Sequence, residues 1–337
     1  MSATRPPEGA QLPPSGTAGS AKGASESARP QHWASLGETT FVSGIWLLYG
    51  VHRLFGRRLV RWLMSPVVLL HWLTRPALRR ASLAYLRRLH RAEPGVFVRE
   101  PGWREGLRHV ACFAETMLDK LLAIAGRYPA TAVREQNFSL VDAMLAQGRG
   151  GIFITAHMGC LELCRMVGRS KRELKLTVLV HTRHAQAFNR ILRRLDPSAA
   201  VNLVEVTDFG PGMAVQLKAL VDDGGWVAIA GDRVPIHSAQ VATVDFLGAP
   251  APLPVGAYVL ASVLHCPLVL LTCLHQGAGY EIRFDLLADR VQLPRGARSQ
   301  ALAQYAQAYA HILQRRLRDS PYDWFNFYAF WDSPHAV

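Results

Sequence analysis

The segment from Gly150 to Glu162 holds the residues whose types and spacing best suit chemistry. Its apolar run predicts a buried strand, His157 stands at the carboxyl end of that strand, and Glu162 follows five residues later. Open α/β sheets bind ligands in the crevice beyond the carboxyl ends of their strands. An imidazole there can take a proton from an alcohol, and a nearby carboxylate can fix its tautomer and stabilise the imidazolium. The pattern therefore suits acyl transfer to a hydroxyl.

The spacing of a histidine and an acid has low specificity by itself. With 13 His and 25 Asp and Glu among 337 residues, about one such pair is expected by chance. The sequence context makes the pattern more specific, because a Gly-Gly turn and an apolar run precede the histidine and a glycine follows it. The alternative is a histidine that caps a strand and a glutamate on a solvated helix.

Positive charge is concentrated in one quarter of the chain. The formal net charge is +13, and the stretch from Arg53 to Arg108 holds thirteen arginines and three glutamates. Such a block indicates an anionic partner: a membrane surface, nucleic acid or an acidic protein. A GC-rich genome would explain the preference for arginine over lysine, but it would not explain the clustering.

The cysteine and glycine patterns argue against several kinds of site. Five cysteines without a Cys-x-x-Cys pair indicate a reducing compartment and disfavour a disulfide scaffold or a structural zinc site. The glycine-containing turns lack the dinucleotide and Walker spacings. We expect neither a metal nor another cofactor.

The N-terminal part divides into a tail and a basic apolar region. Residues 1–30, rich in Pro, Gly, Ser and Ala, are predicted to be disordered and lack the apolar core of a secretory signal, so the globular part should stay on the cytoplasmic side. Residues 31–130 are predicted to be a helical membrane-associating region. Their apolar runs at 41–51 and 59–73 are shorter than the roughly 20 residues of a transmembrane helix, and an amphipathic helix is expected at 77–91. An ordinary helical bundle with a solvated basic face is the alternative.

Strand and helix patterns alternate in residues 131–333, and a further helix is expected before them at 103–125. The alternation predicts an α/β catalytic domain with a mostly parallel sheet flanked by helices. Strands are expected at 151–156, 176–180, 201–205, 226–230, 268–273 and 280–284, and helices at 138–147, 161–168, 187–195, 212–222, 255–264 and 299–317.

From Trp33 to Trp331 the order of these features resembles the late acyltransferases of lipid A biosynthesis, within the lysophospholipid acyltransferase superfamily. The matching residues are the basic apolar N-terminal region, the block from Gly151 to Glu162, Arg183 with Asn189, Gly231-Asp232-Arg233, and Val244-Asp245-Phe246-Leu247-Gly248. The aromatic segment from Trp324 to Trp331 looks closer to the branch found in aryl polyene pathways.

The resemblance implies a membrane-surface O-acyltransferase. His157 would be its catalytic base and Glu162 the partner of that base. Substrate-binding positions would be Arg183, Asp232, Arg233, Phe246 and Gly248. The donor would be an acyl carrier protein or coenzyme A thioester, and the acceptor an anionic lipid or glycolipid at the cytoplasmic face of the inner membrane. One departure is Cys160-Leu161, where the lipid A enzymes usually carry Asn-Trp, so the acceptor pocket is expected to differ.

Three other functions are weighed against this one. A glycerolipid acyltransferase of the lysophosphatidic acid type shares the His-x-x-x-x-acid core but mostly carries Asp where this chain has Glu162. A non-catalytic lipid-binding protein on the same fold would tolerate His157→Ala. Nucleic-acid binding is disfavoured, because no recognition module is present and the arginines alternate with long apolar runs.

Overall fold

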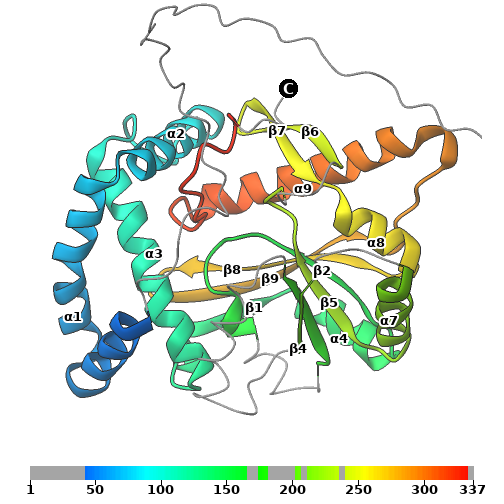
Figure 1. Ribbon diagram of the computed structural model, residues 1–337, viewed down its shortest axis with the longest axis horizontal. Helices are drawn as coiled ribbons and strands as arrows, with labels where there is room; N and C mark the ends of the chain where they lie inside the picture. The colour runs from blue at the N-terminus through cyan, green and yellow to red at the C-terminus, as the bar shows by residue number, and fades with distance from the viewer. Residues whose placement is uncertain (1–41, 165–173, 181–201, 206–210, 235–239, 333–337) are drawn as a thin grey trace, which may run out of the picture. The chain divides into compact units, whose positions relative to one another are not determined.

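A seven-stranded sheet forms the centre of the C-terminal two thirds of the chain (Figure 1). Its order is β1-β9-β8-β2-β5-β3-β4, and β8 and β9 form its antiparallel pair, while the other neighbours are parallel. The strands are β1 (Val133–Gln136), β2 (Gly151–Thr155), β3 (Leu176–Val180), β4 (Asn202–Glu205), β5 (Trp226–Ala230), β8 (Leu268–Gln276) and β9 (Gly279–Ala288). The predicted mostly parallel α/β sheet is confirmed.

The computed structural model describes residues 42–164, 174–180, 202–205, 211–234 and 240–332. They belong to one unit, Gln31–Val337. The described helices are α1 (Val42–Thr74), α2 (Pro76–Ala92), α3 (Trp103–Ile124), α4 (Phe138–Ala146), α7 (Pro211–Asp222), α8 (Gly256–Leu264) and α9 (Arg298–Asp319). The division predicted at residue 130 stays a prediction.

Strand β2 lies in the middle of the sheet and is buried on both faces. Successive side chains of a strand point to opposite faces. Accordingly, Ile152 and Ile154 join the core cluster that contains residues of α7, α8 and α9, while Phe153 joins the cluster with residues of α3 and α4. This double burial explains the continuous apolar run that the sequence shows at this position.

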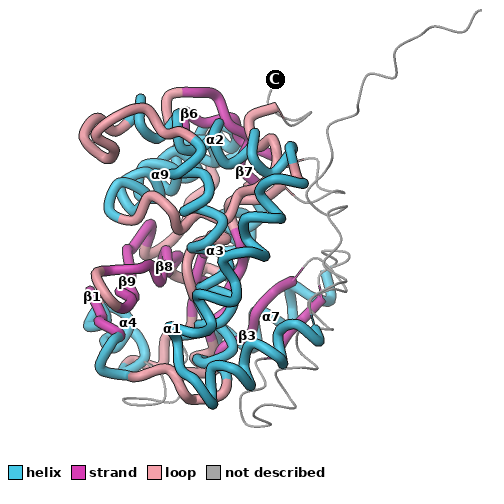
Figure 2. Tube along the Cα trace, turned by 90° about the vertical axis from the view of Figure 1, so that its left-hand side faces the viewer, coloured by secondary structure: helices cyan, strands magenta, loops and turns pink. Residues whose placement is uncertain are grey.

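The two N-terminal apolar runs lie in one helix, α1, with a kink at Gly56, whose φ is +75°. Helix α1 runs alongside α3 (Figure 2). Two of its arginines pair with acids of α3: Arg57 Nη2 lies 2.6 Å from Asp119 Oδ2, and Arg61 Nη2 lies 2.7 Å from Glu115 Oε2. Part of the basic block therefore holds the helices together instead of facing a partner.

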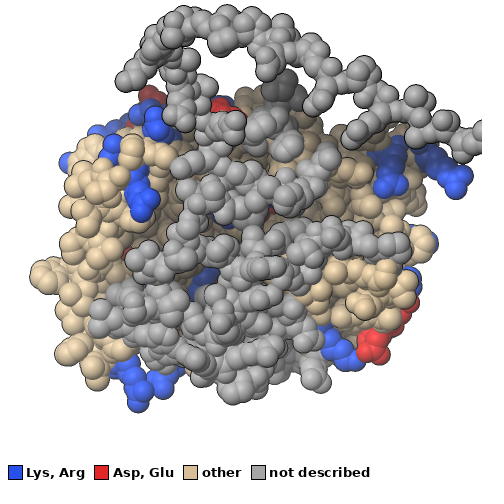
Figure 3. Space-filling model, in the orientation of Figure 1, with Lys and Arg blue, Asp and Glu red and all other residues tan. Residues whose placement is uncertain are grey.

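The outer face of α1 exposes many large apolar side chains. They are Leu54, Phe55, Trp62, Leu63, Val67, Leu69, Leu70 and Leu73. In Figure 3 the left-hand edge, where Figure 1 places α1, is mostly free of charged side chains between Lys and Arg side chains near its top and bottom. Trp72, one of the aromatic residues of this region, is instead buried against Gly106. Within the described ranges, no helix has the length and apolar character that spanning a membrane requires.

Three strands were not predicted from the sequence, and two of them, β1 and β7 (Ala249–Pro254), have an atypical composition. Strand β1 is short and mostly polar. Strands β6 (Val241–Phe246) and β7 form a separate antiparallel hairpin, and β7 carries a proline at every second position. Both strands of a two-stranded ribbon are edges, so the missing N–H groups of the prolines are tolerated.

Two further predicted helices are described only in part or not at all. At residues 161–168, the structure has a short 3₁₀ turn, Leu161–Leu163, and residues 165–168 lie outside the described ranges. The helix predicted at 187–195 also lies outside them.

Candidate active site

Parallel pairing of β2 and β5 brings His157 and Asp232 together. Thr155 is in register with Ala230 at the ends of these strands, and His157 and Asp232 each follow two residues later. The ladder continues with a hydrogen bond from Gly231 N to the Thr155 carbonyl, 2.9 Å long. Both side chains thus leave the sheet at the carboxyl ends of neighbouring strands, the position at which α/β sheets bind ligands.

Asp232 accepts two hydrogen bonds from His157. The backbone N of His157 donates to Oδ2 at 2.9 Å, and Nδ1 lies 2.8 Å from Oδ1. Burial alone would raise the pKa of Asp232, but His157, Arg233 and the indole of Trp324 together lower it to about 2. The carboxylate is therefore ionised and can only accept, so Nδ1 carries the proton and Nε2 keeps its lone pair.

The His157 imidazole is partly open to solvent, with 37% of its side chain exposed. Removal of the ring from bulk water lowers its pKa below the ordinary value, and the positive charges of Arg233 and Lys120 act in the same direction, against the effect of Asp232. A lowered pKa keeps the ring neutral near pH 7. The arrangement provides a neutral base with a defined tautomer at the edge of the sheet.

Glu162 does not occupy the place expected for it. Its carboxylate lies 3.2 Å from Nζ of Lys120, and the Cys160 thiol points toward its other oxygen at 3.7 Å. The structure gives Asp232, and not Glu162, the contact with the imidazole. The spacing predicted a contact between Glu162 and His157. The structure instead places Glu162 against Lys120 and Asp232 against His157.

The backbone explains this correction. Gly159 adopts φ +52°, and a Cβ there would collide with the Cys273 carbonyl, so the chain turns tightly after the histidine. Cys160 N then donates to that same carbonyl at 2.9 Å. The 3₁₀ turn that follows packs against α3, the helix of Lys120, and this directs Glu162 toward Lys120.

The family model for the bacterial lipid A biosynthesis acyltransferase matches residues 105–333, a range that contains both His157 and Asp232. The chain belongs to this family. The protein is therefore an acyltransferase, and lipid A acyltransferases act on a lipid acceptor. No curated protein sequence matches the chain. The closer likeness to the aryl polyene branch stays a prediction.

Arg233 lies beside the His–Asp pair, close enough for its charge to act on His157. Its Nη2 donates to the carbonyl of Phe325 at 3.0 Å, and its guanidinium carbon lies 5.9 Å from the centre of the Tyr328 ring. The side chain is partly exposed. A guanidinium placed next to the base suits an anionic substrate group.

Phe246 and Gly248, two further positions implied by the resemblance, belong to the β6–β7 hairpin. Phe246 is buried, and its ring meets that of Trp324 edge-on at 5.3 Å. Gly248 has φ +73° and follows Leu247, with φ +55°, in the two-residue turn of the β6–β7 hairpin. Arg183 lies outside the described residues.

The sequence analysis missed the role of Trp324 and Lys120 at this site. Trp324 Nε1 donates to Oδ2 of Asp232 at 3.0 Å. The aromatic run at the C-terminus was a visible signal, but nothing in it identifies the carboxylate that the indole reaches. Lys120 lies in a long helix pattern that gives no sign of a functional position.

A second His–Asp pair lies at the end of β8. His275 Nδ1 and backbone N both lie 2.6 Å from the carboxylate of Asp323, and the Cys112 thiol points to the same carboxylate at 3.5 Å. Within the described part of the chain, these three side chains bring metal-ligating atoms within 4.8 Å of one another. Two ligands of a tetrahedral zinc ion lie roughly 3.3 Å apart, given bonds of about 2.0 Å. The 2.6 Å separation is that of a hydrogen bond, so the group does not fit a metal as it stands.

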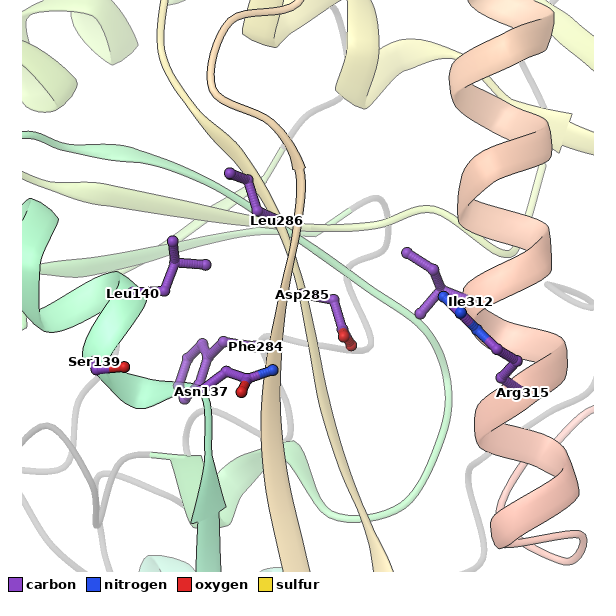
Figure 4. Close-up of a pocket in the computed structure, with 8 residues that line it drawn as sticks. All are labelled: Asn137, Ser139, Leu140, Phe284, Asp285, Leu286, Ile312 and Arg315. Atoms are coloured by element: carbon purple, nitrogen blue, oxygen red, sulfur yellow. The ribbon is translucent and has the colours of Figure 1, made fainter.

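A hollow of about 530 Å³ lies elsewhere on the molecule (Figure 4). Leu140 and Ser139 of α4 stand on one side of it and Ile312 and Arg315 of α9 on the other, with Asp285 of β9 between them. Neither His157 nor Asp232 lines this hollow. Its position away from the His–Asp pair gives no reason to connect it with the chemistry.

Proposed function

We propose that this acyltransferase moves a fatty acyl or polyene acyl group from an acyl thioester to a hydroxyl of a glycolipid or related lipid. The observation that carries the proposal is the position of His157, held by an ionised Asp232 at the carboxyl ends of β2 and β5. A thioester is already activated, so the protein needs to align the hydroxyl, remove its proton and stabilise the tetrahedral oxyanion.

The proposed reaction has two steps. Nε2 of His157 takes the proton of the acceptor hydroxyl while its oxygen attacks the thioester carbonyl carbon. When the tetrahedral intermediate collapses, the carbon–sulfur bond breaks and the imidazolium returns the proton to the leaving thiolate. An ester and a free thiol result. Asp232 stabilises the imidazolium between the two steps.

The cations beside His157 favour an anionic acceptor or donor. Arg233 is partly exposed next to the base, and a guanidinium can bind a phosphate through paired hydrogen bonds. We propose a glycolipid acceptor, with acyl carrier protein as the donor, because the family acts in lipid A biosynthesis. A glycerolipid acceptor is the second candidate, and the anionic headgroup it offers would suit the same cations.

We propose further that the enzyme works at the cytoplasmic face of the inner membrane. The support is the exposed apolar face of α1, which includes Phe55, Trp62 and Leu70. The same helix also exposes the arginines Arg53 and Arg58, which suit anionic headgroups. A helix of this kind lies in the headgroup layer and brings the site to a lipid acceptor.

The proposed function is tested by acyl transfer with defined donors and acceptors. Membranes are prepared from cells that express the wild-type chain. The labelled acyl donor is a thioester of either acyl carrier protein or coenzyme A. The acceptor is either the total lipid of a Gram-negative cell or lysophosphatidic acid. We expect a new acylated glycolipid from the carrier-protein donor, with its mass giving the acceptor and the chain length. Product from lysophosphatidic acid alone would establish the glycerolipid alternative. No product with any pair would favour a lipid-binding protein.

A further inference from the structure

The C-terminal segment from Asp323 to Phe325 runs antiparallel to the stretch that carries the catalytic histidine. Phe325 N donates to the His157 carbonyl at 3.0 Å, and Gly159 N donates to the Asp323 carbonyl at 3.0 Å. Between these two bonds, Met158 and Trp324 form an isolated β-bridge. About 165 residues of chain separate the two segments, so their pairing is a tertiary feature of the site.

Trp324 completes the set of donors around Asp232. Its indole N–H and the backbone N–H of His157 both donate to Oδ2, while Oδ1 accepts from the imidazole. Asp232 is 1% exposed. A buried carboxylate needs several donors to stay ionised, and an indole N–H can only donate.

The surroundings of Trp324 hold its indole in one place. The side chain is buried, and the rings of Tyr85, Phe330 and Trp331 meet it at steep angles with centroids 5.0 to 5.9 Å away. Its carbonyl accepts a hydrogen bond from Nε2 of His109 at 2.9 Å. Because the ring is confined on these sides, the direction of its N–H is determined by the packing.

We propose that Trp324 is a positioning residue of the active site, whose indole N–H fixes the orientation and charge of the Asp232 carboxylate and thereby the basicity of His157. Its effect on the rate rests on the proposed function, whereas its effect on the imidazole does not. The other charged groups that influence His157 are Arg233, which follows β5, and Lys120, on α3. Neither of them touches Trp324 through a hydrogen bond in the described residues.

The direction of the effect follows from the hydrogen bonding. The indole stabilises the anionic carboxylate and draws part of its charge away from the imidazole. Without that bond, Asp232 attracts the imidazolium more strongly, so the pKa of His157 rises. The carboxylate then keeps two of its three donors, so it and the imidazole are held less firmly. A hydrogen bond to a charged group corresponds to about a tenfold change in an equilibrium constant or more.

The test compares Trp324→Phe with Trp331→Phe. Both substitutions keep an aromatic ring in the same cluster, but Trp331 Nε1 donates to the Phe246 carbonyl at 3.3 Å and does not reach Asp232. The pKa of His157 is measured by NMR of labelled histidine, assigned through His157→Gln, and kcat/KM is measured over the same pH range. We expect Trp324→Phe to raise the His157 pKa by about half a unit to one unit and to lower kcat/KM about tenfold. Trp331→Phe should leave the titration unchanged.

An unchanged His157 titration in Trp324→Phe, or an equal shift in both variants, would overturn the proposal. If Trp324→Phe fails to fold, the wild-type protein decides the matter. Its Trp324 indole N–H resonance, assigned by its shift in Asp232→Asn, should move as His157 titrates. A resonance that does not move would contradict the proposal. An absence of acyl transfer by the wild type would remove the proposed function and leave this readout intact.

Discussion

The described part of the molecule contains two His–Asp pairs with the same local geometry and different surroundings. In each, one carboxylate holds both the backbone N and the Nδ1 of a single histidine: Asp232 with His157, and Asp323 with His275. The two imidazoles are similarly exposed, 37% and 28% of their side chains. The pairing itself therefore does not distinguish a catalytic histidine from a structural one.

The difference lies in strand topology and in the neighbouring charges. His157 leaves the sheet at the ends of two parallel strands, with Arg233 and Lys120 close enough to affect its pKa. His275 lies at the end of a tight antiparallel hairpin and pairs with Tyr280 across it, and the centroids of the two rings are 4.1 Å apart with the planes tilted by 37°. The first environment opens toward a substrate and can bind an anion, whereas the second anchors the C-terminal segment to β8. A comparison of the two pairs therefore separates the contribution of a carboxylate to catalysis from its contribution to stability.

Neutralising each carboxylate in turn is the strongest test of the difference between the two pairs. Asp232→Asn should lower kcat on the order of 1,000-fold, because an amide can stabilise the wrong tautomer and no longer balances the imidazolium. Asp323→Asn should retain most of the activity and lose thermal stability. Acyl-transfer rates and melting temperatures of the two variants provide the measurement. A large, equal loss of activity in both variants, with folding intact, would mean that the second pair also serves catalysis.

His109, which binds the Trp324 carbonyl between the two pairs, should govern stability and not chemistry. Burial lowers its pKa to about 4, although the Trp324 carbonyl on Nε2 and the charge of Asp323 act in the opposite direction. The Ser82 hydroxyl forms the hydrogen bond with Nδ1. The unfolded chain binds a proton near pH 6.5 and the folded chain does so only near 4, so stability should fall as the pH drops through this window, by about 3 kcal/mol in all.

Urea unfolding of wild type and His109→Gln between pH 7 and 4 measures this contribution. The variant should have lower stability at pH 7 but a flatter dependence on pH. An identical slope in the two proteins would show that His109 does not carry the effect.

Glu162 provides a smaller test of which acid supports the base. Because it contacts Lys120 and not His157, Glu162→Gln should cost about tenfold in kcat/KM, through a displaced lysine, and should not alter the tautomer of the imidazole. The matched variant is Lys120→Met, which should cause a similar loss. A loss as large as that of Asp232→Asn would restore Glu162 as the partner of the histidine.

The pH dependence of the reaction gives the smallest expected effect. Because the pKa of His157 is lowered in the folded protein, the acid limb of kcat/KM should fall below pH 6.5, the ordinary value for histidine. Activity should therefore be retained at mildly acidic pH. A profile of kcat/KM from pH 5 to 8 measures the limb, and a limb above pH 7 would contradict the environment described for His157.

Local sequence patterns predicted the central elements of the fold because these elements satisfy local rules. Strand β2 is a continuous apolar run, and α2 places Arg80, Arg87 and Arg91 opposite its buried face. The hairpin of β6 and β7 violates such rules through its alternating prolines and was missed. The kinked α1 was expected as two runs because Arg53, Arg57 and Arg58 separate the apolar stretches, whereas the helix continues past them with a kink at Gly56.

The sequence indicated residues for a candidate site but not the contacts between them. Both His157 and Asp232 stood out, yet their pairing depends on the register between β2 and β5, which are separated by about 70 residues. Glu162 looked like the partner because a continuous helix was assumed after Gly159, where the chain instead makes a 3₁₀ turn. The donor on Trp324 required tertiary pairing with the C-terminal segment, for which the sequence has no local signal.

The central claim is that His157 is the base for acyl transfer, and that His275, which has the same hydrogen-bond pattern, is not. The most direct measurement is the rate of acyl transfer by His157→Ala and His275→Ala, purified side by side at equal folded concentration. We predict a loss of at least 100-fold for His157→Ala, and for His275→Ala activity within a few-fold of the wild type. Wild-type rates from His157→Ala, or an equal collapse of both variants, would contradict the account.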